Sequence, residues 1–235
     1  MSIFAVADLH LSFNINKPMY VFGDNWIGYE EKIKKDWMEK ITDNDLVLLP
    51  GDFSWETYLE NTYKDFEFIN NLPGKKILLK GNHDYWWSTV TSMRKFIKEQ
   101  GFENIDFLYN NSYEYNGYII AGARGWSLTD ESKDEKFINR ELNRLELSLE
   151  DGINKFGKDK EIIVCMHYPP IISKKLNNNE ELKFVNLMKK YNVKKCLYGH
   201  LHASSIKDAV EGTIEGIEFK LVSIDGLDFK VYKVI

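Results

Sequence analysis

The sequence predicts an α/β fold, and three observations support this. Short apolar runs alternate along the chain with segments of helical period, as in proteins that place helices against a largely parallel sheet. Of the 235 residues, 43% are hydrophobic and 29% are charged, which suits a globular protein with a sizeable core. No repeat, low-complexity tract or linker interrupts the alternation. We therefore predict one domain over residues 1–235.

The predicted elements follow from local pattern. Five runs are short, continuous and apolar, as expected of strands buried on both faces, and they cover residues 3–7, 46–49, 77–79, 162–166 and 196–198. Between them, Ile33, Trp37 and Ile41 recur at four-residue steps, which predicts a helix. The same periodicity predicts helices over residues 58–72, around Val90 to Lys98, and over 137–156.

Two further strand pairs are predicted in the second half of the chain. Tyr113 and Tyr115 precede Asn116-Gly117, a two-residue turn signal, and residues 118–121 follow as the return strand of a hairpin. Residues 217–222 and 229–234 are predicted to pair with each other and complete a sheet.

All five histidines lie in short polar segments that directly follow the predicted strands. A fifth segment of this kind has no histidine and supplies a carboxylate. The five are Asp8-Leu9-His10, Gly51-Asp52, Gly81-Asn82-His83-Asp84, Met166-His167-Tyr168 and Gly199-His200-Leu201-His202. Because ligands of open α/β sheets bind beyond the carboxyl ends of the strands, we expect these segments to meet on one rim. Imidazole and carboxylate gathered in this way predict a site for two transition-metal ions, and with it a metal-dependent hydrolase.

Charge and cysteine content narrow the class of protein further. A net charge of −5 and a pI near 5.6 argue against long nucleic acid as a partner, but not against a small phosphorylated substrate. The first apolar run is too short for a signal peptide and no stretch has the length of a transmembrane helix, so no membrane partner is expected. Cys165 and Cys196 lie inside apolar runs, which favours reduced, buried thiols and a cytoplasmic location. The oligomeric state is left open.

In their order along the chain, the five polar segments resemble the signature of the calcineurin-like metallophosphoesterases, over residues 8–202. The surroundings of residues 81–87 and 122–126 resemble a bacterial group of predicted phosphohydrolases within that superfamily. The resemblance implies a four-layer α/β/β/α metallophosphoesterase sandwich with two metal ions, Mn²⁺, Fe or Zn²⁺, at its rim.

The resemblance also implies a role for each residue. One ion would be held by Asp8, His10, Asp52 and His202, and the other by Asp52, Asn82, His167 and His200, so that Asp52 bridges the two ions. A metal-activated hydroxide would then attack a phosphate monoester or diester. His83 would be the general acid that protonates the leaving oxygen. Asp84 would orient the His83 imidazole and favour its charged form.

One further candidate residue, Arg124, and two alternative functions of the protein remain to be considered. Arg124 follows a strand and could contact a phosphate oxygen in a bidentate way, although a surface arginine at the exit of a hairpin is an equally good interpretation. A non-catalytic scaffold on the same fold would be expected to lack His83 or a ligand, and none is missing. A DNA-repair-type nuclease would be favoured by a capping domain and a basic groove, and the sequence shows neither. A binuclear metal-dependent phosphohydrolase is therefore favoured, with its substrate undetermined.

Overall fold

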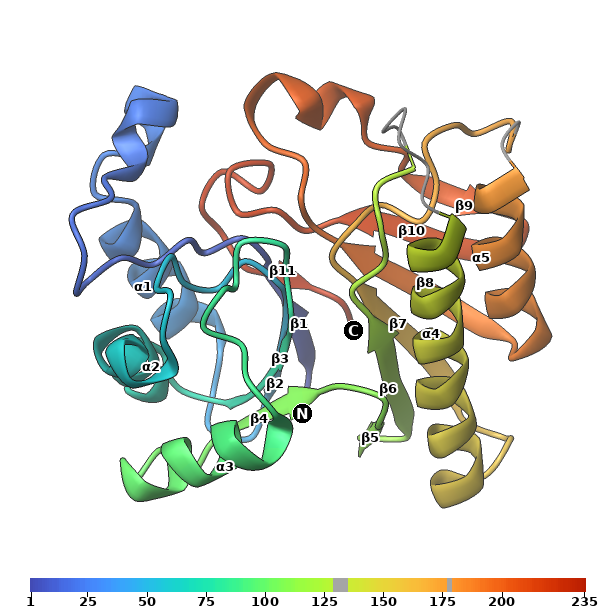
Figure 1. Cartoon of the computed structure of the whole chain (residues 1–235), viewed down its shortest axis with the longest axis horizontal. Helices are drawn as coiled ribbons and strands as arrows, with labels where there is room; N and C mark the ends of the chain where they lie inside the picture. The colour runs from blue at the N-terminus through green and yellow to red at the C-terminus, as the bar shows by residue number, and fades with distance from the viewer. Residues whose placement is uncertain (129–134, 177–178) are drawn as a thin grey trace.

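The computed structural model describes residues 1–128, 135–176 and 179–235. Two β-sheets lie between two layers of helices (Figure 1), which confirms the four-layer α/β/β/α arrangement. The first sheet has the order β11-β1-β2-β3-β4, with β11 (Tyr232–Lys233), β1 (Ile3–Ala5), β2 (Leu46–Pro50), β3 (Lys75–Leu79) and β4 (Ile105–Leu108). The second has the order β5-β6-β7-β8-β10-β9, with β5 (Tyr113–Tyr115), β6 (Tyr118–Ala123), β7 (Glu161–Met166), β8 (Val193–Tyr198), β10 (Ile217–Leu221) and β9 (Gly212–Ile214).

The inner strands of each sheet run parallel, so their carboxyl ends share one edge. β1, β2, β3 and β4 pair in parallel, and so do β6, β7, β8 and β10. Only outer strands are antiparallel among those described, namely β11, β5 and β9. This arrangement places the segments that follow β1, β2, β3, β7 and β8 on the same rim of the molecule.

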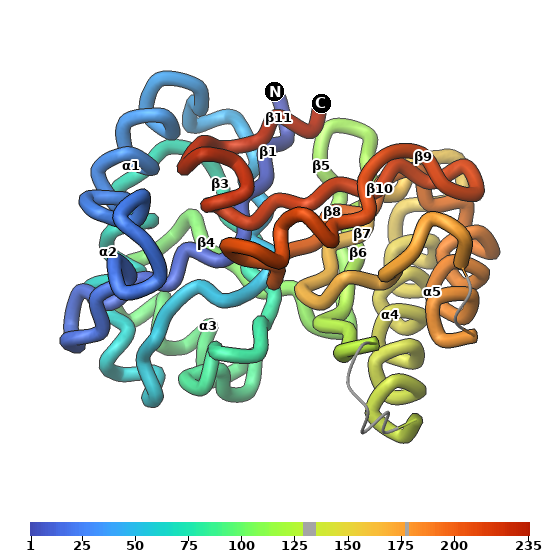
Figure 2. Tube along the Cα trace, turned by 90° about the horizontal axis from the view of Figure 1, so that it is seen from above, coloured from blue at the N-terminus to red at the C-terminus, as the bar shows by residue number. Residues whose placement is uncertain are grey.

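Helices cover the outer face of each sheet (Figures 1 and 2). The first sheet is covered by α1 (Tyr29–Lys40), α2 (Tyr63–Asn70) and α3 (Val90–Glu99), and the second by α4 (Glu135–Phe156) and α5 (Asn179–Lys190). Short 3₁₀ helices occur at Met19–Phe22, Asp24–Trp26, Leu59–Thr62 and Ala203–Asp208. The predicted helices are confirmed, whereas β4, β9 and α5 were not predicted.

Alternation along the strands divides the core into three apolar layers. In the first strand run, Phe4 and Val6 pack against the helices of the first sheet, whereas Ile3 and Ala5 pack between the two sheets. Successive side chains of a strand point to opposite faces, so one continuous apolar run supplies two layers. The third layer lies between the second sheet and helices α4 and α5.

The tyrosine hairpin is confirmed, but the pairing predicted for the last two strands is wrong. Tyr115 pairs with Tyr118, and Asn116 and Gly117 both have positive φ, as a type I′ turn requires. In contrast, β10 pairs with β8 and β9 in the second sheet, while β11 pairs with β1 in the first. The chain therefore crosses from one sheet to the other between them, which brings its two ends side by side (Figure 2).

Two observations concern the predicted cellular setting. Within the described ranges, every helix is too short or too polar to cross a bilayer. Cys165 and Cys196 are both buried and free, as predicted. The cytoplasmic location itself stays a prediction.

Candidate metal centre

The seven predicted metal ligands converge at the rim. Their donor atoms come from the segments that follow five strands of the two sheets. The residues are Asp8 and His10 after β1, Asp52 after β2, Asn82 after β3, His167 after β7, and His200 and His202 after β8. Carboxylate oxygens and imidazole nitrogens of Asp8, His10 and His202 all lie within 4.8 Å of one another, and so do those of Asp8, Asp52 and His167.

The backbone at this rim adopts an uncommon conformation. Asp8, His10, Asp52 and His200 have φ values of 63°, 46°, 51° and 75°, in the left-handed region that side chains with a Cβ rarely occupy. Each such residue costs on the order of 1–3 kcal/mol and persists only where the surrounding structure enforces it. Strain concentrated at four of seven converging residues indicates a functional site.

One group of donor atoms joins the two sheets through Asp8. Its Oδ1 lies 3.4 Å from Nε2 of His202. The Nε2 atoms of His10 and His202 are themselves 3.4 Å apart, and Nε2 of His10 lies 3.7 Å from Oδ2 of Asp52. Two imidazole nitrogens and two carboxylates thus face one point.

The second group gathers around the side chain of Asn82. Its Oδ1 lies 2.6 Å from Nε2 of His167 and 2.9 Å from Nδ1 of His200. The Nε2 atom of His167 lies 3.6 Å from Oδ2 of Asp52. The same Asp52 oxygen therefore faces both groups of donors.

The electrostatics of these groups suit cations. Burial, followed by the negative charge of Asp8, raises the pKa of Asp52. Burial lowers the pKa of His10 and that of His200, the latter to about 3 with the help of the neighbouring His167. Oδ1 of Asp8 is buried and accepts no hydrogen bond. Despite burial, the charge of Asp8 and the hydrogen bond to Asp225 raise the pKa of His202 to about 10. Buried carboxyl groups and imidazoles, with no thiolate, form a donor set that fits Mn²⁺, Fe or Zn²⁺.

Partners outside the converging atoms hold the imidazoles in place. Nδ1 of His202 lies 2.9 Å from Oδ1 of Asp225, and Nδ1 of His167 lies 3.1 Å from the carbonyl oxygen of Pro50. Such contacts fix the ring orientation and leave Nε2 free for a metal. Asp225 was missed in the sequence, although it lies three residues after the predicted strand 217–222, much as the predicted ligands follow their own strands.

His83 lies beside the converging donors without joining them. Its backbone N–H donates to Oδ1 of Asp52 at 2.8 Å. Its half-buried ring lies 5.8 Å from that of His10 and 4.6 Å from that of Trp55, between centroids. Burial and the charge of His167 lower the pKa of His83.

Asp84 does not orient the His83 imidazole, contrary to the prediction. Its Oδ1 accepts hydrogen bonds from the backbone of Phe53 at 2.9 Å and Ser54 at 3.3 Å and from the indole of Trp86 at 3.0 Å. Its Oδ2 accepts from the backbone of Asp52 at 2.9 Å and Gly81 at 2.7 Å. This fully buried carboxylate thus ties the loops after β2 and β3 together, because five N–H groups converge on it.

Trp55 and Lys17 form a wall beside His10, and sequence patterns did not indicate Trp55 as part of it. The Trp55 ring stacks on that of His10 with centroids 4.5 Å apart, and the ammonium of Lys17 lies 3.3 Å from the Trp55 ring centroid. A tryptophan three residues after Asp52 has no distinctive spacing, so only its three-dimensional position marks it.

Arg124 is not the surface arginine that the sequence also allowed. Its Nε is buried and forms no hydrogen bond, and its guanidinium lies 4.9 Å from the ring of Trp126. Its carbonyl oxygen accepts from the backbone N–H groups of His167 and Tyr168, at 3.1 and 2.9 Å. The backbone of Arg124 is therefore held next to a predicted metal ligand.

Solved structures share this fold at low sequence identity. A protein of unknown function from Aquifex aeolicus is 16% identical, with a TM-score of 0.51, over 99% of this chain and 95% of that one. The phosphopantetheinyl hydrolase of Mycobacterium tuberculosis is 13% identical, with a TM-score of 0.56, over 100% and 95%. The anchor in the inner membrane complex of Plasmodium is 12% identical, with a TM-score of 0.51, over 95% and 71%. No curated protein matches the chain.

The family comparison agrees with the geometry of the rim. The model of the calcineurin-like phosphoesterases matches residues 1–204, which include every strand-end segment with a predicted ligand. The chain therefore belongs to the calcineurin-like phosphoesterase family and is a metal-dependent phosphoesterase.

Proposed function

We propose that this protein hydrolyses a small phosphate monoester or diester with two metal ions, which Asp52 bridges. The observation that carries the proposal is the position of Asp52 Oδ2, 3.7 Å from Nε2 of His10 and 3.6 Å from Nε2 of His167. A carboxylate between two sets of nitrogen donors can share its charge with two cations. Asp8, His10 and His202 complete one set, and Asn82, His167 and His200 complete the other.

The bound ions would supply Lewis-acid polarisation of a phosphoryl oxygen and would lower the pKa of a water between them. The chain's own residues set the geometry. The five N–H groups bound to Asp84 hold the loops of Asp52 and Asn82 at a fixed separation. Asp225 and the Pro50 carbonyl orient two of the imidazoles.

His83 is the proposed general acid. Its backbone is fixed to Asp52, while no hydrogen bond to its imidazole occurs within the described residues. The ring is thus beside the metal centre with its nitrogen atoms available to a leaving oxygen. The lowered pKa of His83 favours the neutral imidazole near neutral pH. The negative charge of the bound phosphate would raise that pKa again, so that the ring carries the proton it donates.

The other functions that the sequence left open have less support. A scaffold has no need to bring seven potential metal ligands together with four of them on strained backbone, at considerable energetic cost. A nuclease for long DNA would need an extended basic surface, whereas the chain carries a net charge of −5.

Metal reconstitution tests the proposal. Chelated protein should lose phosphoesterase activity, and Mn²⁺, Fe²⁺ or Zn²⁺ should restore both the activity and close to two ions per chain. A screen of p-nitrophenyl phosphate against bis-p-nitrophenyl phosphate then separates monoester from diester hydrolysis. Full activity in thoroughly demetallated protein would contradict the proposal.

Asp52→Asn tests the bridging role itself. Because the amide carries no charge to share, this variant should lose bound metal and turnover together. Asp228→Asn is the matched control, since that exposed carboxylate pairs only with Lys230 among the described residues. Two tightly held ions in Asp52→Asn, with turnover equal to that of the control, would show that Asp52 is not the bridge.

A further inference from the structure

The arginines of this chain are gathered in a single pocket. Of its 31 basic residues only four are arginines, and these are Arg94, Arg124, Arg140 and Arg144. All four line one pocket of about 630 Å³. All other basic residues of the chain are lysines. The gathering of arginines therefore indicates a phosphate site, because arginine binds phosphate in a bidentate fashion that lysine cannot reproduce. We call it the arginine pocket.

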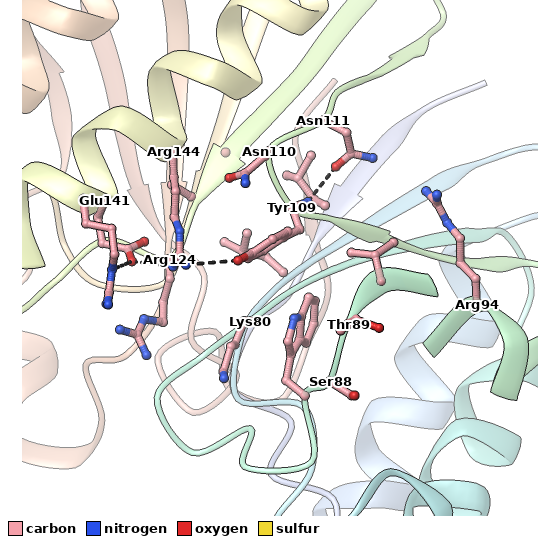
Figure 3. Close-up of a pocket in the computed structure, with 17 residues that line it drawn as sticks. Lys80, Ser88, Thr89, Arg94, Tyr109, Asn110, Asn111, Arg124, Glu141 and Arg144 are labelled. Atoms are coloured by element: carbon pink, nitrogen blue, oxygen red, sulfur yellow. Dashed lines mark hydrogen bonds and ion pairs between the residues drawn. The ribbon is translucent and has the colours of Figure 1, made fainter. Parts of the chain in front are cut away.

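Elements of both halves of the fold form its walls (Figure 3). Lys80 follows β3 and Arg124 follows β6, while Arg140 and Arg144 come from α4. Arg94, from α3, lies on the side opposite to Arg124 and Arg144 (Figure 3). The volume falls within the range of small-molecule sites, which is about 300–1,000 Å³.

Positive charge in the arginine pocket exceeds negative charge. Glu141 is its one carboxylate among the lining residues, and it pairs with Arg140 at 3.4 Å and Arg144 at 2.7 Å. Arg94 pairs with Asp106 at 2.8 Å. Arg144 also donates to the hydroxyl of Tyr109 at 3.0 Å (Figure 3).

Two cations of the arginine pocket are left without an ionic partner among the described residues, Arg124 and Lys80. Nε of Arg124 is buried and has no hydrogen-bond acceptor. Lys80 and Arg124 both line the arginine pocket, so two like charges without an ionic partner border the same space. An anion placed between them would relieve both the repulsion and the missing hydrogen bond.

The arginine pocket adjoins the metal centre. Lys80 directly precedes Gly81-Asn82, and the carbonyl oxygen of Arg124 accepts the backbone N–H of His167 at 3.1 Å. Two residues of the pocket wall are therefore joined through the backbone to two predicted ligands of the same metal, Lys80 to Asn82 through Gly81 and Arg124 to His167.

We propose that the arginine pocket binds a second phosphate group of the substrate while a first phosphate is hydrolysed at the metal centre. This inference rests on the proposed function and narrows it, since the substrate class becomes a small molecule that carries two phosphates. Arg124 and Lys80 receive the second phosphate, and Arg140 and Arg144 add positive charge behind them.

Two experiments test the pocket, and one of them does not require catalysis. Calorimetric titration of pyrophosphate into the chelated full-length chain measures phosphate binding when no metal is present to bind it. Steady-state kinetics of the metal-loaded enzyme then compares adenosine 3′,5′-bisphosphate with adenosine 5′-monophosphate, which lacks one phosphate. The variants are Arg124→Met and Lys80→Met, with Lys95→Met as a control of equal charge change on the exposed face of α3.

Pyrophosphate should bind the wild-type chain with a stoichiometry of one. Arg124→Met should weaken that binding by about ten- to a hundredfold, since a charge-assisted hydrogen-bonded pair is lost, and Lys95→Met should not change it. Arg124→Met and Lys80→Met should each abolish the preference, in kcat/KM, for the bisphosphate over the monophosphate.

Equal pyrophosphate affinity in wild type, Arg124→Met and Lys80→Met would overturn the inference, as would the absence of any bisphosphate preference in an active enzyme. If pyrophosphate binding depends on Arg124 but no ester is hydrolysed with any of the metals, phosphate binding in the arginine pocket is supported and the proposed hydrolysis is refuted. The circular dichroism spectrum and the melting temperature of each variant show whether it is folded, and Lys80→Met tests the pocket if Arg124→Met does not fold.

Discussion

Gly81 is the position where a single methyl group should disable the metal centre. A Cβ built there would lie 2.0 Å from Oδ1 of Asp52 and 2.2 Å from its backbone nitrogen. Ordinary contacts begin near 3.4 Å, so Asp52 would have to retreat by about 1.4 Å, the difference between 3.4 and 2.0 Å. The backbone atom cannot rotate away, and the proposed bridging carboxylate therefore moves with it.

The magnitude follows from that displacement. A misplacement of about 1 Å at a reacting centre costs on the order of 10²-fold in rate, so Gly81→Ala should lower kcat/KM at least about a hundredfold. Metal affinity should fall as well, because Oδ2 of Asp52 is shared by both groups of donors. Overpacking should also reduce the free energy of unfolding by about 1–3 kcal/mol.

The assay is steady-state hydrolysis of p-nitrophenyl phosphate with metal content measured on the same samples. Gly101→Ala is the control, because its φ of +75° makes alanine strained while no atom lies within 4 Å of the new Cβ. It should lose about 1 kcal/mol of stability and keep full activity. If Gly81→Ala retains wild-type kcat/KM and both ions, the proposed dependence on the position of Asp52 is refuted.

Three further outcomes are expected. His83→Asn should keep its bound metal while turnover falls by about 10²–10⁴-fold, more for an alkyl phosphate than for p-nitrophenyl phosphate, whose leaving group needs little protonation; loss of metal in this variant would make His83 a ligand instead. Asp84→Asn places an amide N–H₂ where backbone N–H groups need an acceptor. Urea unfolding should therefore show a loss of at least about 2 kcal/mol in the free energy of unfolding. An unchanged unfolding midpoint would contradict the role of Asp84 in joining the loops. Lys76 is 1% exposed, and burial lowers the pKa of its ammonium from 10.5 to about 7. Between these two pH values the unfolded chain binds the proton more tightly than the folded chain. The free energy of unfolding of the wild type should therefore rise by on the order of 3 kcal/mol from pH 7 to pH 10. Lys76→Met should lack that part of the rise, and identical pH profiles for the two proteins would show that the ammonium is not buried.

Much of the fold was predictable because its signals are local. Asn116-Gly117 determined the hairpin, since both residues readily adopt positive φ. The strand runs at β1, β2, β3, β7 and β8 were visible as apolar segments, and parallel pairing then places their ends on one rim. The order of the polar segments along the chain added the family resemblance, and with it the two packed sheets.

The features that were missed depend on partners distant in sequence. The run at residues 217–222 has the composition of a strand, but its composition does not determine which strand it pairs with. It pairs with Cys196 and Leu197 of β8, whereas residues 229–234 were predicted as its partner. The role of Asp84 was misjudged because adjacency to His83 in sequence suggested contact. The structure turns the two side chains to different partners, and the five N–H groups around Asp84 come mostly from the loop after β2.

The crossing of the chain between β10 and β11 has a consequence for biosynthesis. Ala7, next to Asp8, donates its N–H to the carbonyl oxygen of Val222 at 2.7 Å and accepts from the N–H of Ile224 at 3.1 Å. The last proposed metal ligand, His202, is made about twenty residues earlier than this clamp. Because chains fold as they leave the ribosome from the N-terminal side, the nascent protein carries every proposed ligand before the strand of Asp8 is held against its final neighbour. Until residues 222–224 are made, Ala7 lacks both of these hydrogen bonds, so Asp8 is without part of the support that holds it in the finished rim.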